Sequence, residues 1–143
     1  MSSRTRTSSK SSKSRIKYVP RSNSDGDFYV NAIGPDGRRY GYIDVEVGVG
    51  AVTGVGRLAY VENAVVESKH RQNQIAAGLF NKAAQVACAQ GLRLASYATR
   101  TKAIEAFWRK RVAQGRATCA VKGGSTAKSK CKIFALKCPV RRK

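Results

Sequence analysis

Residues 65–91, VVESKHRQNQIAAGLFNKAAQVACAQG, combine a β-branched run, a polar elbow and a long amphipathic stretch that ends at a glycine. A strand that turns directly into a helix presents unpaired amides and the positive end of the helix dipole. Phosphate groups bind there when small side chains let them approach the backbone. Ala76, Ala77 and Gly78 are small, and Arg71 adds charge. The pattern predicts an anion cradle; an ordinary strand-to-helix connection is the alternative interpretation.

Three carboxylates lie upstream of this elbow. Asp44 and Glu46 share one face of their predicted strand because side chains alternate with period two, and Glu62 lies on the next strand. Carboxylates in such positions can form part of an acidic ligand environment. The alternative interpretation is a solvated strand face for Asp44 and Glu46 and a plain exposed strand residue for Glu62.

The elements that must position these groups follow from periodicity. Alternating patterns predict strands at residues 27–34 and 38–49, joined by a tight turn at Asp36-Gly37. Because the third predicted strand and the fourth flank the long helix, we expect them to be parallel neighbours. The remaining predicted elements are a strand over about 58–67, a helix over about 72–90 ending before Gly91, a strand in LRLASYA, a short helix over about 99–111 capped by Thr99 or Thr101, and strands over about 117–121 and 131–138. The long helix carries one apolar stripe, formed by Ile75, Ala76, Leu79, Phe80, Ala83 and Ala87.

Composition limits the domain organisation and the class of partner. The 143 residues are 42% apolar, enough for one folded domain. The 28 basic against 8 acidic residues give a net charge of +20, which favours polyanionic partners. Residues 1–24 and 68–143 are strongly basic, whereas residues 25–67 carry more acids than bases. This split predicts two ligand environments, one acidic and one basic.

The two ends of the chain read as tails around one domain. Residues 1–24 are rich in Ser and basic residues, which predicts a disordered tail. Residues 139–143 are expected to form a short basic tail, and the domain between the two tails covers residues 25–138. The longer tail fits a solvating arm, an anchor for nucleic acid or an anionic surface, or an organelle transit peptide. Residues 121–130 are expected to form a mobile basic hairpin loop.

The cysteines and the apolar runs suggest a compartment. Cys88, Cys119, Cys131 and Cys138 show no CxxC pair, and His70 is the only histidine, so we expect buried, reduced thiols and no metal. No apolar stretch reaches the roughly 18 residues that a membrane span needs, and the N-terminus lacks a secretory signal. The expected protein is soluble and intracellular, with no membrane partner.

The elbow also resembles a known motif. VVESKHRQNQIAAGLF is similar to the acetyl-coenzyme A signature of the GNAT superfamily of N-acetyltransferases, approximately V-x-P-x-Y-R-G-x-G-I-G-x-x-L. Arg71 matches the arginine, and Ala76 matches the second loop glycine, where alanine is also allowed. The strand YVENAVV lies directly upstream as in the family, and TKAIEAFW resembles the helix motif N-x-x-A-I-x-F-Y. The resemblance covers about residues 27–138.

The resemblance implies an α/β fold of GNAT type, with a mixed, mostly antiparallel twisted sheet of about six strands and two main helices. It implies acetyl-coenzyme A as cofactor, with the pantetheine arm between splayed central strands and the pyrophosphate at the start of the long helix. Glu62 takes the place of the general base, while Asp44 and Glu46 face an amine acceptor such as a lysine, an N-terminus or a small amine. The implied cofactor-binding residues are Val65, Val66, Arg71, Gln72, Asn73, Gln74, Ile75, Ala76 and Ala77.

The chain departs from the family pattern at three places. Gln74 stands where the pattern has a glycine. Phe107 or Trp108 stands where many members have the tyrosine that acts as general acid and protonates the departing thiolate. Tyr97 could replace that phenol only if it points into the cleft. The family's first strand is missing unless RIKYVP supplies it. These departures keep open a second function, a nucleic-acid-binding or particle-associated structural protein on a GNAT scaffold without turnover.

Overall fold

The structure of the chain is a computed structural model. It describes residues 15–23, 26–52, 56–97, 102–123 and 131–138, without the side chains of residues 49, 51, 52, 71–73 and 103. The tail at 139–143, the caps Thr99 and Thr101, and most of the expected hairpin loop lie outside these residues. Within them, no helix is both long and apolar enough to span a membrane.

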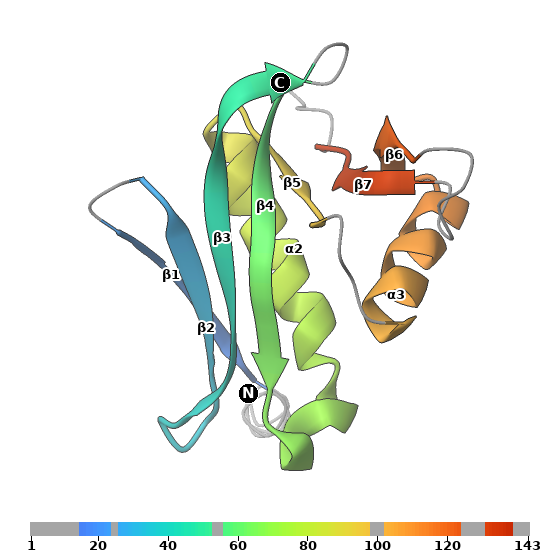
Figure 1. Ribbon diagram of the computed structural model, residues 1–143. Coiled ribbons are helices and arrows are strands. Elements are labelled where there is room, and N and C mark those ends of the chain that lie inside the picture. The colour runs from blue at the N-terminus through green and yellow to red at the C-terminus, as the bar shows by residue number, and fades with distance from the viewer. Residues whose placement is uncertain (1–14, 24–25, 53–55, 98–101, 124–130, 139–143) are drawn as a thin grey trace, which may run out of the picture.

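In the described part of the chain, seven strands form one mixed sheet in the order β1-β2-β3-β4-β5-β7-β6 (Figure 1). The only parallel pair among these neighbours is β4 with β5, as the order of the elements predicts. The mixed, mostly antiparallel α/β class is therefore confirmed, but the sheet has seven strands instead of about six. The strands are β1 Lys17–Ser22, β2 Phe28–Ile33, β3 Arg39–Val52, β4 Gly56–Val66, β5 Arg93–Ala95, β6 Ala117–Lys122 and β7 Cys131–Leu136.

The additional strand, β1, lies in the segment expected to be a disordered tail. Its antiparallel pairing with β2 covers all six of its residues, so the expected boundary at residue 24 is wrong. Tyr18 packs against the core and Pro20 is tolerated because β1 is an edge strand. RIKYVP thus supplies a first strand, while residues 1–14 lie outside the described part of the chain.

Two helices cover one face of the sheet. Helix α2, Ile75–Ala89, follows a 3-10 helix, η1 Ser68–Asn73, and helix α3 is Lys102–Ala113. Figure 1 shows α2 behind β3 and β4, and α3 beside the β6–β7 pair. The buried stripe of α2 comprises Ile75, Leu79, Phe80, Ala83 and Ala87, whereas Ala76, expected in this stripe, is exposed.

Two glycines with positive φ set the β2–β3 turn and the end of α2, as the sequence predicts. Gly37 has a φ of 84°, and Gly34 donates its amide to the Arg38 carbonyl at 2.9 Å, closing the β2–β3 turn. Gly91, with a φ of 77°, ends α2, and the Leu92 amide bonds to the Ala87 carbonyl at 2.8 Å. The second pattern is a Schellman end, which satisfies the last helical carbonyls.

The four cysteines form two disulfides, so the expectation of reduced thiols is wrong. Cys119 joins Cys131 between β6 and β7, and Cys88 on α2 joins Cys138 just after β7. The spacing in sequence could not reveal these pairs because each depends on how separate elements pack. Disulfides persist in oxidising compartments, so they argue against a reducing cytosol. The intracellular location stays a prediction.

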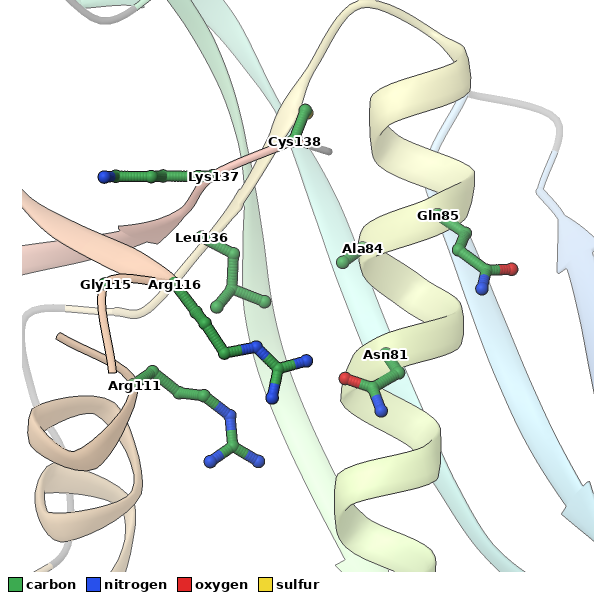
Figure 2. A pocket seen from close by; sticks show the side chains of 9 residues that line it. All are labelled: Asn81, Ala84, Gln85, Arg111, Gly115, Arg116, Leu136, Lys137 and Cys138. Atoms are coloured by element: carbon green, nitrogen blue, oxygen red, sulfur yellow. The ribbon is translucent and has the colours of Figure 1, made fainter. Parts of the chain in front are cut away.

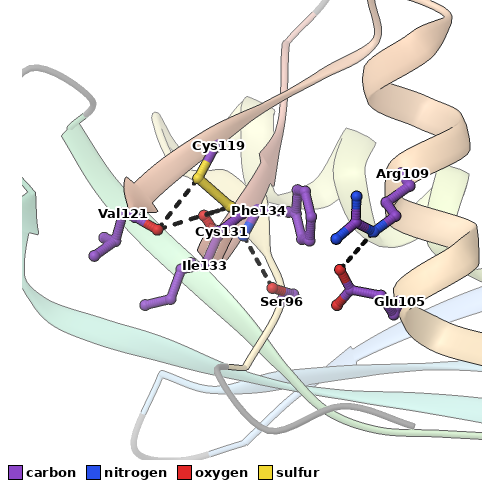
Figure 3. A network of polar contacts seen from close by, with 8 residues as sticks. All are labelled: Ser96, Glu105, Arg109, Cys119, Val121, Cys131, Ile133 and Phe134. Carbon is purple, nitrogen blue, oxygen red and sulfur yellow. Dashed lines mark hydrogen bonds and ion pairs between the residues drawn. A yellow bond between two sulfur atoms is a disulfide. The ribbon is translucent and has the colours of Figure 1, made fainter. Parts of the chain in front are cut away.

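The β6–β7 pair meets the rest of the sheet through β5 (Figure 3). The buried Ser96 donates its amide to the Phe134 carbonyl at 2.8 Å, and its hydroxyl oxygen accepts the Phe134 amide at 3.0 Å. Only one residue pair, Ala95 with Ala135, joins the two strands in register. The sheet is therefore narrowly connected at this point, directly beside the end of β5.

Candidate functional site

The polar elbow is fixed onto β3 by an aromatic stack. The His70 ring lies on the Tyr40 ring with 3.5 Å between centroids and an interplanar angle of 9°. The Glu67 amide also donates to the Tyr40 carbonyl at 2.9 Å, at the point where β4 ends. Both contacts hold η1 against the sheet, so the start of α2 has a defined position relative to β4.

Gln74 ends η1 and begins α2 in a left-handed conformation. Its φ and ψ are 57° and 28°, and it is the one non-glycine residue with positive φ among the described residues. This conformation costs an ordinary side chain about 1 kcal/mol and favours glycine. Gln74 therefore takes the backbone shape of the glycine that it replaces in the family pattern. The left-handed conformation of Gln74 also explains why α2 begins at Ile75 and not at about Gln72, where the sequence predicts its start.

Among the described side chains, none caps the first amides of α2. The Gln74 side chain makes no capping hydrogen bond, and no acidic residue lies in the first turn. Ala76 is exposed and Ala77 is half-buried there, while Ile75 belongs to the core. A small, exposed residue such as Ala76 favours the approach of an anion to the backbone.

For some of the other expected cofactor-binding residues the structure describes the side chain, and for others only the backbone. Val65 is exposed near the end of β4, and Val66, next to it, packs against the core. The backbones of Arg71, Gln72 and Asn73 form the last turn of η1, but their side chains lie outside the described part. Whether the Arg71 guanidinium faces the helix start stays a prediction.

Gly78 makes room for a contact with β1 that the sequence did not predict. A Cβ at this position would collide with the phenol of Tyr18 on β1. The missing side chain lets β1 pack closely on α2, while the expected part of Gly78 in the approach of a phosphate stays a prediction. Burial in this contact raises the pKa of Tyr18.

Next to the elbow, the two central strands diverge. β5 pairs with β4 over only three residues, and the last pair is Tyr60 with Ala95. β4 continues to Val66 with β3 on its other side. Over residues 61–65, the β5 side of β4 therefore has no strand partner in the described structure.

A bulge in β4 lies just past this point of divergence. Val61 pairs with Val45 and Asn63 pairs with Asp44, so Glu62 is the extra residue. Core-facing residues alternate as Ala59 and Val61 before the bulge and as Ala64 and Val66 after it. Glu62 and Asn63 consequently both stay exposed, away from the helices. Bulges often redirect side chains beside functional sites.

Glu46 and Tyr97 meet on this helix-free face. The Tyr97 hydroxyl donates a 2.6 Å hydrogen bond to a Glu46 carboxylate oxygen. Tyr97 also lies beside Tyr60, with 6.1 Å between ring centroids. Tyr60 was not predicted as a site residue, although its register opposite Glu46 places it there.

The carboxylates of Glu46 and Glu62 raise the pKa of Tyr97. The hydrogen bond to Glu46 raises the pKa of Tyr97 well above its usual range, and burial and the neighbouring Glu62 raise it further. Tyr97 is therefore protonated at neutral pH, as a hydrogen-bond donor must be. The geometry gathers Glu46, Glu62 and Tyr97 into one group, which we call the acid–phenol cluster. Asp44 lies farther along β3, opposite Asn63, and has no part in this pKa shift.

Neither aromatic residue of TKAIEAFW supplies a polar group to this cluster. Trp108 is fully buried and stacks on Phe134, with 6.1 Å between centroids. Phe107 packs against Phe80 at 4.3 Å. Both rings thus belong to the contact between α3 and the core. The phenol that lies where β4 and β5 diverge is that of Tyr97.

No protein-family model matches the chain, and no curated protein matches it. A functional conclusion therefore depends on the geometry above and on the resemblance of the motif. Among the described residues, no three or more His, Cys, Asp or Glu side chains are grouped so that they could hold a metal ion.

Proposed function

We propose that the protein is a GNAT-type N-acetyltransferase that transfers an acetyl group from acetyl-coenzyme A to a primary amine. The observation that carries the proposal is the divergence of β4 from β5 after Tyr60, directly before an uncapped helix start. A strand edge without a partner can bind an extended chain through backbone hydrogen bonds. The helix start can bind a pyrophosphate.

The residues present fit this cofactor at the helix start. The described side chain of Gln74 does not cap the first amides of α2, and Ala76 beside them is exposed. Ala76, Ala77 and the predicted Arg71 would hold the pyrophosphate, and the exposed Val65 would flank the pantetheine arm. Acetyl-coenzyme A, when bound, supplies the acyl group in activated form as a thioester.

The acid–phenol cluster can handle the protons of the reaction. An acceptor that arrives as an ammonium ion must lose a proton before its nitrogen can attack. Glu62, redirected by the bulge, is the carboxylate for that step, and Glu46 would help to bind the cation. A cation beside these carboxylates would offset their effect on Tyr97 and lower its pKa, which would make it a better proton donor. Asp44 would contribute charge from farther along the strand.

Titration with acetyl-coenzyme A by calorimetry tests the proposal. Arg71→Glu should weaken binding severalfold because it places a negative charge beside the pyrophosphate. Lys122→Glu, the same charge change at an exposed position on β6, should have little effect. Circular dichroism melts of both variants would show that the fold is intact. Equal affinity in the two variants, or no binding by the wild type, would contradict the proposal.

The net charge of +20 supports a second candidate, a nucleic-acid-binding protein without turnover. Such binding weakens steeply with salt because counterions are released from the phosphate backbone. Absence of acetyl-coenzyme A binding together with salt-dependent binding of oligonucleotides would favour this second function.

A further inference from the structure

A pocket of about 530 Å³ lies between α2 and the C-terminal end of α3, and it shares no residue with the elbow or the acid–phenol cluster. In Figure 2 the guanidinium groups of Arg111 and Arg116 extend toward α2, where the Asn81 amide faces them. Leu136 and Ala84 contribute apolar surface beside these polar groups, above them in Figure 2. The Lys137 and Gln85 side chains point away from the space between the two guanidiniums.

The end of α3 brings the two arginines together. Gly115 has a φ of 76°, and the Arg116 amide donates to the Arg111 carbonyl at 2.8 Å. The Gly115 amide donates to Val112 at 2.9 Å, which completes a Schellman end. The chain therefore reverses at Gly115 and places Arg116 beside the last turn of the helix.

The Arg111 side chain is held in place by an aromatic ring. Its guanidinium lies 4.3 Å from the centroid of Phe107, one helical turn earlier. Phe107 in turn packs on Phe80 of α2. The guanidinium is thus positioned over the seam between the two helices before any ligand arrives, which reduces the entropy lost on binding.

The two positive charges lack a carboxylate in the pocket. None of the described residues that line it is acidic, and the one acidic residue of α3, Glu105, pairs with Arg109 at 2.8 Å. Burial lowers the pKa of Arg111, and the neighbouring Arg116 lowers it further. The negative end of the α3 dipole stabilises nearby cations, yet it offers no hydrogen-bond acceptor of full charge.

We propose that this pocket binds a small phosphate-bearing molecule, with Arg111 and Arg116 on the phosphate and Leu136 and Ala84 against its apolar part. Two guanidiniums and an amide are suited to phosphate oxygens, because arginine donates paired hydrogen bonds in a fixed plane. The volume exceeds what a phosphate alone needs and lies in the range of sites for small organic ligands. The site is separate from the one proposed for acetyl-coenzyme A.

Nuclear magnetic resonance of the full chain with inorganic pyrophosphate as probe tests this proposal at physiological salt. Amide shifts should change at Gly115, Arg116 and Leu136, and they report this pocket separately from any change at Gln74 to Ala77. The double variant Arg111→Gln/Arg116→Gln should weaken binding in the pocket roughly tenfold or more, since both hydrogen bonds are charge-assisted. Lys17→Gln/Arg21→Gln removes the same charge from β1 and should leave these shifts unchanged.

Four outcomes would overturn the proposal. Equal weakening in both double variants would mean general attraction to a cationic surface. Shifts at Gln74 to Ala77 alone would place the anion only at the elbow. A response to a short single-stranded oligonucleotide but none to pyrophosphate would mean that the arginines bind a nucleic-acid backbone. Loss of thermal stability in Arg111→Gln/Arg116→Gln without any change in the pyrophosphate shifts would assign the arginines to helix stability alone.

Discussion

Tyr97 reaches Glu46 across 51 positions of sequence and across the intervening strand β4, and its hydroxyl lies 2.6 Å from the carboxylate. β4 separates the two strands, because Tyr60 pairs with Glu46 on one side and with Ala95 on the other. The contact therefore bridges the sheet at the point where β4 and β5 diverge. It links the shape of the sheet to the protonation of the group proposed to do chemistry.

The pKa of Tyr97 should fall when Glu46 loses its charge. In Glu46→Gln the strongest cause of the raised pKa is removed, while Glu62 remains. Tyrosine ring carbon signals followed by NMR across alkaline pH would report the shift. Asp44→Asn, on the same face of β3, is the matched control and should leave the Tyr97 titration unchanged. Identical titrations in the wild type and Glu46→Gln would contradict the contact.

The same shift makes stability depend on alkaline pH. Below about pH 10 both folded and unfolded Tyr97 keep their proton, so the contribution to stability is fully present. Above that value the unfolded chain loses the proton first, and stability falls as pH rises toward the folded pKa. Tyr97→Phe should therefore lose less stability than the wild type in urea titrations above pH 10. A remaining decrease is expected from Tyr18 and Tyr40, whose pKa values burial also raises.

Glu62→Gln should lower the rate of acetyl transfer by roughly 10²-fold at neutral pH, a typical general-base contribution. Cofactor affinity should persist, and higher pH should partly restore the rate because the amine then arrives neutral. Thiol release with amines, polyamines and lysine-rich peptides measures this. Glu105→Gln, which removes a carboxylate from α3, is the control. Equal rates in Glu62→Gln and the wild type would exclude Glu62 as the base.

Gly78→Ala should destabilise the fold, although alanine is normally the better helix residue. The new methyl would meet the Tyr18 phenol, and overpacking of this kind costs about 1 to 3 kcal/mol. In a Tyr18→Ala background the same change should become stabilising by about 1 kcal/mol, the ordinary difference in helix propensity. Urea denaturation of the four proteins measures the coupling. Additive effects would show that β1 does not pack on α2.

The two disulfides should leave no cysteine reactive toward a thiol reagent, and they should contribute unequally to the free energy of unfolding. Cys88–Cys138 closes a separation of 50 residues and Cys119–Cys131 one of 12. Loop-closure entropy predicts losses of about 4 and about 3 kcal/mol for the paired alanine variants. Native protein treated with a thiol reagent should show no free cysteine. Four reactive thiols in carefully oxidised protein would contradict both bonds.

Local signals in the sequence were sufficient for most elements. Alternation predicted β2, β3, β4, β6 and β7 to within a few residues, because each strand has one face in the core. Gly37 and Gly91 marked their turn and helix end because only glycine adopts positive φ at little cost. The parallel pairing of β4 with β5 followed from the order of the elements. The elbow and Glu46 were singled out by residue type and strand phase, and Glu62 by its place in the resemblance, while their functions stay predictions.

What the tertiary structure decided depends on contacts between distant segments. β1 lacks a local signal and exists because β2 offers an open edge and Gly78 makes room for Tyr18. The bulge at Glu62 is a mismatch in length between two strands, which neither strand shows by itself. The cysteine pairs and the partner of Tyr97 likewise arise only once the strands and helices are packed. Periodicity encodes which face of an element is buried, whereas the partner across that face is set by the packing of the whole chain.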